Sequence, residues 1–283
     1  MSNGRLDIEY FDGGVLVDNI EAFDALSEGV LDLMVDASFY RTGIMPVQGL
    51  VYGYPGCYRN LGECLVYLHQ FGMADILRQA YADHNIYYLG VEPDAGVSIL
   101  SKKPLRSIDD LEGLKMRVGG GAGSTLGDAG VAVVSVGAAE LYTSLSTGII
   151  DSVVYGGIAV ADRLKLQETA KYWMMPYLLG SHMVNVFLVN MDTWNALPND
   201  LKAILQGAYL AVESNLYRAD YHLDRVVGKE WQTEYGVEMI NFPQEDQDKL
   251  AAYSMERLNE LAASDPIAAK AVEALKQMWA VMR

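Results

Sequence analysis

Basic residues, cysteine and long apolar runs are all scarce in this sequence, and each scarcity excludes a class of protein. Lys and Arg total 21 against 37 Asp and Glu, which gives a net charge of −16. Nucleic acids and anionic membranes bind positive surfaces, so this charge balance argues against both as partners. The same charge repels a small anion, so an anionic ligand would need a positive group at its own binding site.

No apolar run reaches the roughly 18 residues that a membrane-spanning helix needs. The segment 1–11 has neither the basic region nor the apolar region of a secretory signal. We therefore expect either a cytosolic protein or a chain from which a leader has been trimmed. The chain has 283 residues, 51% of them hydrophobic, which is enough for two folded domains or one large one.

The two cysteines are Cys57 and Cys64. On a helix this spacing places them about 10 Å apart along the axis, too far for a disulfide, whereas on a loop they could pair. We expect two free, partly buried thiols, with the disulfide as the alternative. No histidine or carboxylate stands at metal-site spacing around them, so the sequence predicts no metal centre.

Apolar segments typical of strands alternate with short helical segments through the middle of the chain. The expected strands are 6–10, 30–35, 85–90, 97–100, 114–118, 131–136, 149–154, 183–190 and 237–242, and the expected helices are 19–28, 61–84, 107–110, 122–129, 138–147, 199–235, 244–262 and 266–282. This order predicts an α/β fold with a parallel sheet covered on both faces. The helix at 199–235 would exceed about 50 Å, so we expect it to cross from one lobe of the protein to another.

A glycine run follows the strand at 114–118, in the sequence RVGGGAGST. It satisfies neither the dinucleotide fingerprint nor the phosphate-binding loop, because the third glycine of the first and the lysine of the second are missing. A helix that opens near Ala122 would still present free N–H groups and a positive dipole end. Gly119 would let the backbone approach a ligand there.

Arg117 lies between Met116 and Val118 in this otherwise apolar strand. Its planar fork matches a carboxylate, so Arg117 is the candidate for binding an organic anion. The alternatives are a salt bridge with Glu112 or Asp128, or a charge that faces outward. An unpaired buried charge is costly, so the apolar neighbours favour a specific partner.

A second candidate segment, DSVVYGG at 151–157, follows a predicted strand at the edge where open α/β sheets bind ligands. Tyr155 could offer a hydroxyl and a ring there, or could belong to the core. The four histidines are scattered, and no motif of a serine hydrolase or a zinc protease is present. We therefore expect a binding protein, with a two-lobed enzyme acting on a small carboxylic acid as the alternative.

Three separated segments resemble the substrate-binding proteins of TRAP transporters. They are DLEGLKMRV at 110–118, ELYTSLSTGIID at 140–151 and WNALP at 194–198. The resemblance covers nearly the whole chain, and the segment DHNIYYLGVEP followed by SKKPLRSIDDL is closest to the branch that binds 2-oxo acids and related monocarboxylates. It implies a two-lobed α/β fold of the periplasmic binding protein type, with a ligand cleft between the lobes and the helix 199–235 spanning both.

The resemblance also implies residue roles and partners. Arg117 would pair with the substrate carboxylate, and Gly119, Ser152, Tyr155 and Asn185 would be the further ligand contacts. The protein would work in the periplasm without a cofactor and deliver a small organic acid anion to the TRAP membrane subunits. A homodimer through the C-terminal helices is a further expectation. Lobe I would comprise 1–95 and 183–222, and lobe II 96–182 and 223–283.

Three departures from the family pattern matter. The Gly4-Arg-Leu segment comes almost at once, so the family's first strand and helix, with the preceding signal, are expected to be missing. The stretch 152–155 holds no carboxylate or amide, which argues against a cation that bridges the ligand. The region 96–99 lacks the second arginine of many members, which favours a monocarboxylate over a dicarboxylate.

Overall fold

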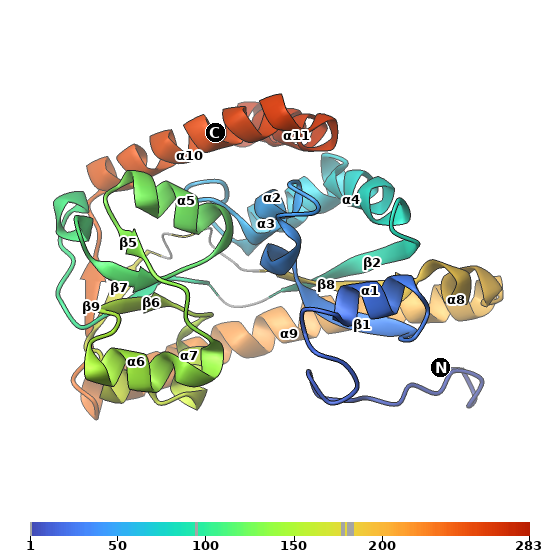
Figure 1. The fold of residues 1–283 in the computed structure, drawn as a ribbon, viewed down its shortest axis with the longest axis horizontal. Helices are drawn as coiled ribbons and strands as arrows, with labels where there is room; N and C mark the ends of the chain where they lie inside the picture. Colours follow the sequence, from blue (N-terminus) through green and yellow to red (C-terminus); the bar gives the residue numbers. More distant parts are fainter. Residues whose placement is uncertain (1, 94–95, 177–178, 180–183) are drawn as a thin grey trace.

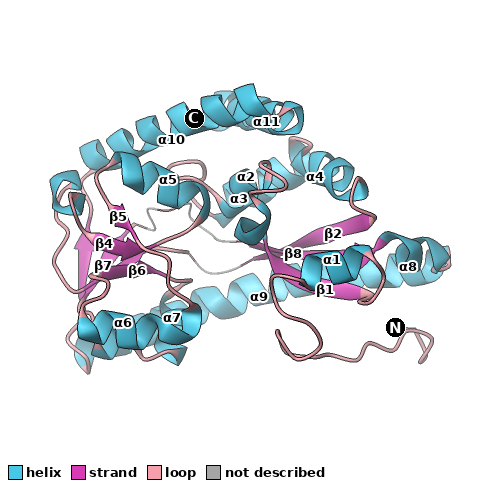
Figure 2. Cartoon of the chain, in the orientation of Figure 1, coloured by secondary structure: helices cyan, strands magenta, loops and turns pink. Residues whose placement is uncertain are grey.

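The computed structural model describes residues 2–93, 96–176, 179 and 184–283. Its strands form two separate sheets, one at each end of the molecule (Figures 1 and 2). We call the parts built around them the small-sheet half and the large-sheet half. Helix α9 runs along one side of both halves, and helices α10 and α11 run along the opposite side.

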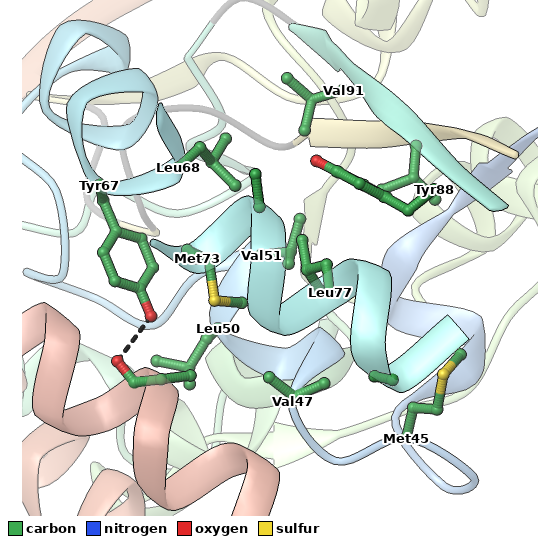
Figure 3. Packing of buried hydrophobic residues seen from close by; sticks show 14 of the residues in the cluster. Met45, Val47, Leu50, Val51, Tyr67, Leu68, Met73, Leu77, Tyr88 and Val91 are labelled. Atoms are coloured by element: carbon green, nitrogen blue, oxygen red, sulfur yellow. Dashed lines mark hydrogen bonds between the residues drawn. The ribbon is translucent and has the colours of Figure 1, made fainter. Parts of the chain in front are cut away.

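The small-sheet half is built on three antiparallel strands in the order β1-β8-β2. These are β1 (Leu33–Ala37), β8 (Val184–Asn190) and β2 (Ile86–Pro93). The elements packed around them are α1 (Ala22–Ser27), η1 (Ser38–Arg41), α2 (Gln48–Tyr52), α3 (Leu61–Gln70), α4 (Met73–Ala82), α8 (Met191–Ala196) and α11 (Pro266–Met282). In their core the side chains of Val51, Met73 and Leu77 point toward one another (Figure 3). The Tyr67 hydroxyl donates to the Ala271 carbonyl at 2.7 Å and so ties α3 to α11.

The large-sheet half contains six strands in the order β5-β4-β6-β3-β7-β9. These are β5 (Ala132–Val133), β4 (Lys115–Arg117), β6 (Ser152–Val154), β3 (Ile99–Ser101), β7 (Tyr172–Met175) and β9 (Glu238–Asn241). The other elements are η2 (Ile108–Leu111), α5 (Gly120–Asp128), η3 (Ala138–Glu140), α6 (Leu141–Thr147), α7 (Ile158–Arg163), η4 (Leu166–Glu168) and α10 (Gln244–Ser264). Strand β3 is antiparallel to both of its neighbours, whereas the other pairs are parallel. The predicted parallel sheet is therefore confirmed for three of the five strand pairs and wrong for the two that involve β3.

Helix α9 (Asn199–Thr233) crosses from one half to the other, as the sequence predicted. Its first turns bury Leu205 and Tyr209 against β2, and near its end Trp231 is fully buried beside Trp173. None of the described side chains in the stretch 211–223 is buried. The two ends of α9 therefore belong to different cores. Within the described ranges, no helix is both long and apolar enough to cross a bilayer.

Two predicted elements differ in the structure. The segment 6–10 is not a strand, and Ile8 and Tyr10 are 59% and 81% exposed, because no described strand pairs with this segment. The helix predicted at 61–84 is two helices, α3 and α4, since Gly72 between them has a left-handed φ of +81°. The terminal helices α10 and α11 agree with the prediction.

Both cysteines are free and buried, which agrees with the expectation of two free thiols, although only Cys64 lies on a helix. Burial raises the pKa of Cys57 to about 12, and burial also raises the pKa of Cys64. The thiolate is the reactive form, so neither thiol is activated for chemistry. The predicted residue boundaries of the two lobes remain a prediction, and both residues of the expected boundary at 182–183 lie outside the described residues.

Arg41 anchors the start of the chain to the small-sheet half, which gives a stability prediction. Its guanidinium pairs with Asp36 at 2.7 Å, with both side chains 5% exposed, and it donates to the carbonyls of Asn19 and Ile20. Arg41→Met leaves the Asp36 carboxylate buried without its cation, so we expect a loss of about 3–5 kcal/mol of unfolding free energy in urea denaturation. The matched control Arg78→Met removes an exposed pair with Asp75 and should change it by less than about 1 kcal/mol. Equal effects of the two variants would contradict this assignment.

A second prediction concerns pH. His69 on α3 contacts Glu213 on α9 at 3.2 Å, and this hydrogen bond raises the pKa of His69 above its usual 6.5. The charged form of His69 is therefore favoured in the folded state. Its contribution to stability is fully present at pH values below about 6.5, and it is lost as pH rises through the folded-state pKa. The difference in unfolding free energy between wild type and His69→Gln should therefore shrink from pH 5.5 to pH 8. A difference that stays constant over this range would contradict the charged contact.

Candidate functional site

Arg117 is the last residue of β4, where parallel pairing places it opposite Val153 of β6. Its side chain is half-buried. The Nε group donates to the Val136 carbonyl at 3.3 Å, and Nη1 donates to the Val154 carbonyl at 2.9 Å. These two carbonyls orient the guanidinium fork without neutralising its charge.

The sequence left two alternatives for Arg117: a salt bridge with Glu112 or Asp128, or a charge that faces outward. The contacts of these residues in the structure decide between them. Asp128 pairs with Arg257, with 2.7 Å between its Oδ2 and the arginine Nε. Glu112 forms no ion pair with Arg117, and no carboxylate of the described chain lies within ion-pair distance of the guanidinium. The half-burial and the two carbonyl bonds also argue against a charge that faces bulk water. The remaining N–H groups, including both on Nη2, have no hydrogen-bond partner in the described part of the chain.

Tyr155 lies beside this guanidinium. It directly follows the end of β6, and its half-buried ring lies with its centroid 5.7 Å from Cζ of Arg117. A cation near an aromatic ring is stabilised without losing its capacity to bind an anion. The Tyr155 hydroxyl forms no hydrogen bond within the described ranges, so the structure brings together a cationic fork and an unused hydroxyl.

The glycine run that follows Arg117 in the sequence forms the start of α5. Gly119 caps the helix in an extended conformation, and Gly120 adopts a left-handed φ of +61°. A Cβ on Gly121 would lie 2.4 Å from Cζ of Tyr54, a residue of the small-sheet half. The glycines thus allow a sharp strand-to-helix turn and a close contact between the halves.

The other two predicted contacts lie elsewhere. Ser152 is fully buried at the start of β6, and its Oγ has no partner in the described part of the chain, so its burial does not support a contact with ligand. Asn185 is on β8 in the small sheet, where Nδ2 donates to Glu92 at 3.1 Å. The structure therefore groups Arg117, Gly119 and Tyr155, and it places Asn185 in the other half.

Sequence reasoning missed three features of this region: the carbonyls of Val136 and Val154, and the ring of Tyr54. Backbone carbonyls leave no mark in a pattern of side chains. The tyrosine lies far from the glycines in the sequence, so only the folded contact reveals it.

The arrangement resembles an anion-binding site more than a catalytic or metal site. Within the described residues, no group of three or more histidines, cysteines and carboxylates could hold a metal ion. Arg117 is held in place by neutral groups, so a carboxylate that reaches it would gain a charge-assisted bidentate pair.

Comparison with known proteins identifies the family. Residues 1–265 match the family model described as DctP, bacterial extracellular solute-binding protein, family 7. The chain belongs to this family. Its members bind solutes for TRAP transporters and are not catalysts, so the alternative of an enzyme is set aside.

Individual relatives are consistent with this family. The chain is 30% identical over 217 residues to a monocarboxylate 2-oxoacid-binding periplasmic protein of Nostoc sp., an alignment that covers 76% of this chain and 59% of that protein. It spans between 54% and 64% of the length of three curated relatives.

Solved structures show the same fold. A TRAP periplasmic solute-binding protein of Pseudoalteromonas atlantica, with sodium and pyruvate bound, is 26% identical with a TM-score of 0.81, over 92% of this chain and 79% of that one. A protein of the same kind from Rhodoferax ferrireducens, with malonate bound, is 21% identical with a TM-score of 0.87, over 99% of this chain and 88% of that one. These likenesses confirm the predicted two-lobed periplasmic binding protein fold.

The stretch beside Arg117 at the end of β6 offers no side chain typical of a cation site. The stretch 152–157 at the end of β6 contains no carboxylate or amide, and the Val154 carbonyl already accepts from Arg117. A cation at this point would also lie against the guanidinium, which repels it. Within this stretch, no carboxylate or amide side chain is therefore available to hold a cation.

The contact of Gly121 with Tyr54 leads to a prediction about packing between the halves. Gly121→Ala places a methyl group against the tyrosine ring, and such overpacking should cost about 1–3 kcal/mol of unfolding free energy. The matched control is Gly127→Ala on the same helix, where a Cβ meets nothing within 4 Å. That variant should be neutral or gain about 0.5–1 kcal/mol. Thermal and urea unfolding measure both, and a harmless Gly121→Ala would contradict the close contact.

Proposed function

We propose that this protein is an extracytoplasmic receptor for a small carboxylic acid, and that Arg117 binds the carboxylate. One observation carries the proposal: a half-buried guanidinium is oriented by two carbonyls and has no carboxylate partner among the described residues. Such a charge is stabilised when an anion completes its hydrogen bonds. With a net charge of −16 on the chain, a local cation is required for an anion to bind at all.

The favoured ligand is a monocarboxylate such as a 2-oxo or 2-hydroxy acid. A dicarboxylate would require a second cation, and the segment 96–99 supplies none. The Nostoc relative is described as binding monocarboxylate 2-oxoacids, and the Pseudoalteromonas neighbour was solved with pyruvate. Both descriptions support this class of ligand.

The acid would lie between the two halves. Arg117, the Gly119 backbone and the Tyr155 hydroxyl would contact it from the large-sheet half, and Asn185 would approach from the small-sheet half. Closure of the halves would exclude water and strengthen the ion pair by lowering the local dielectric constant. Residues 1–95 with 183–222, and 96–182 with 223–283, would be the two moving lobes.

The partners follow from the family. The receptor would work in the periplasm and deliver its acid to the membrane subunits of a TRAP-type secondary transporter. A homodimer through α10 and α11 remains part of the proposal. Helix α11 turns its apolar residues inward, while Val281 near its end is 77% exposed.

Substitution of Arg117 tests the proposal. Arg117→Ala removes the charge-assisted pair, so the affinity for pyruvate should fall about 30-fold to several thousand-fold in calorimetry. Arg117→Lys keeps the charge but loses the fork, and an intermediate affinity is expected. The matched control is Arg106→Ala in the same half, which removes only an exposed pair with Glu238 and should bind like wild type.

Thermal unfolding of each unliganded variant shows whether the fold is retained. If Arg117→Ala remains folded and binds the acid with wild-type affinity, the assignment of the site is wrong. If the wild-type protein binds none of a panel of 2-oxo and 2-hydroxy acids, the ligand class is wrong.

A further inference from the structure

Tyr155 is placed beside Arg117 by the chain on both sides of it. It directly follows Val154, whose carbonyl accepts from Nη1 of Arg117 at 2.9 Å, so the guanidinium is bonded to the residue next to the tyrosine. The ring centroid of Tyr155 lies 5.7 Å from Cζ of Arg117, and the ring also packs against the core of the large-sheet half. After it, Gly156 has a left-handed φ of +58° and turns the chain into α7. The fold therefore determines where the ring lies relative to the guanidinium.

Both side chains of this pair keep capacity for hydrogen bonds. Each is half-buried, so neither is closed off from a ligand. Nη2 of Arg117 and the hydroxyl of Tyr155 form no hydrogen bond with the part of the chain that the structure describes. A guanidinium only donates, whereas a phenol hydroxyl both donates and accepts. The two groups therefore suit different atoms of one small molecule, a carboxylate for the guanidinium and a neutral oxygen for the hydroxyl.

The charges around this pair weigh against a metal ion beside the acid. The Pseudoalteromonas neighbour was solved with sodium as well as pyruvate. In this chain a monocarboxylate would bring one negative charge to the one positive charge of Arg117, so the two together are neutral. A metal ion would add positive charge, and no carboxylate of the described chain lies within ion-pair distance of the guanidinium to balance it. An uncharged donor therefore fits beside the arginine better than a cation does.

We propose that the Tyr155 hydroxyl binds the oxygen on C2 of the acid in the place of a metal ion, while Arg117 binds the carboxylate. The inference rests on the proposed function and narrows it to 2-oxo and 2-hydroxy acids that bind without sodium or calcium. The hydroxyl donates to a 2-oxo group, and it can also accept from a 2-hydroxyl. Because it is neutral, it recognises this oxygen without adding charge to the pair of acid and arginine.

The first measurement is the dependence of binding on metal ions. Calorimetry compares pyruvate, added as its choline salt, in sodium chloride, in calcium chloride and in choline chloride with a chelator, all at one ionic strength. We expect the three dissociation constants to agree within about twofold, since Arg117 alone neutralises the carboxylate. A larger loss of affinity in choline chloride overturns the inference, because a metal ion would then take part in binding.

The second measurement compares Tyr155→Phe, which keeps the ring and removes only the hydroxyl, with wild type. The loss of one hydrogen bond should weaken pyruvate and lactate by about 5- to 20-fold. Propanoate has no oxygen on C2 and should bind within about twofold of wild type. The matched control is Tyr142→Phe in the same half, whose exposed hydroxyl donates to Glu168 at 2.9 Å, and it should bind all three acids like wild type. Thermal unfolding of the unliganded variants checks that each is folded.

The outcomes separate the two claims. If wild type binds pyruvate and Arg117→Ala does not, but Tyr155→Phe binds all three acids like wild type, the role of the hydroxyl is overturned and the proposed function stands. Equal losses for pyruvate and propanoate overturn that role as well, because the hydroxyl would then not recognise the oxygen on C2. If wild type binds none of the acids in any of the three salts, the proposed function fails and this inference fails with it.

Discussion

A guanidinium held by neutral oxygen atoms is the interaction on which the rest of this structure depends. The carbonyls of Val136 and Val154 fix the fork of Arg117, and the ring of Tyr155 lies beside it. The parallel pairing of β4 with β6 brings these groups together, since it places Arg117 opposite Val153. An acidic neighbour would have satisfied the arginine permanently. Neutral partners orient it and leave its charge available to a ligand.

The glycines next to this arginine have a clear role in packing. Gly120 needs its left-handed conformation to turn the chain from β4 into α5, and Gly121 lets α5 approach the ring of Tyr54. The same short segment therefore sets where α5 begins after Arg117 and how closely the two halves pack. This double role explains why a glycine run follows the arginine although no phosphate-binding fingerprint is present.

Much of the fold could be predicted from the sequence, because its signals are local. The long helical segment 199–235 predicted α9, and the apolar strand before the glycines predicted the setting of Arg117. What failed depends on distant parts of the chain. The alternation at 6–10 is that of a strand, but a strand forms only where a second one pairs with it. The antiparallel placement of β3 and the burial of Ser152 likewise follow from topology, which periodicity does not encode.

The middle of α9 enters neither core, which determines how this helix joins the two halves. Each end of this helix is built into a different core, through Tyr209 at one end and Trp231 at the other, while none of the described side chains between 211 and 223 is buried. A continuous helix resists changes in length but bends gently at low cost. It therefore acts as a strut of fixed length that sets how far apart the two halves lie along its axis.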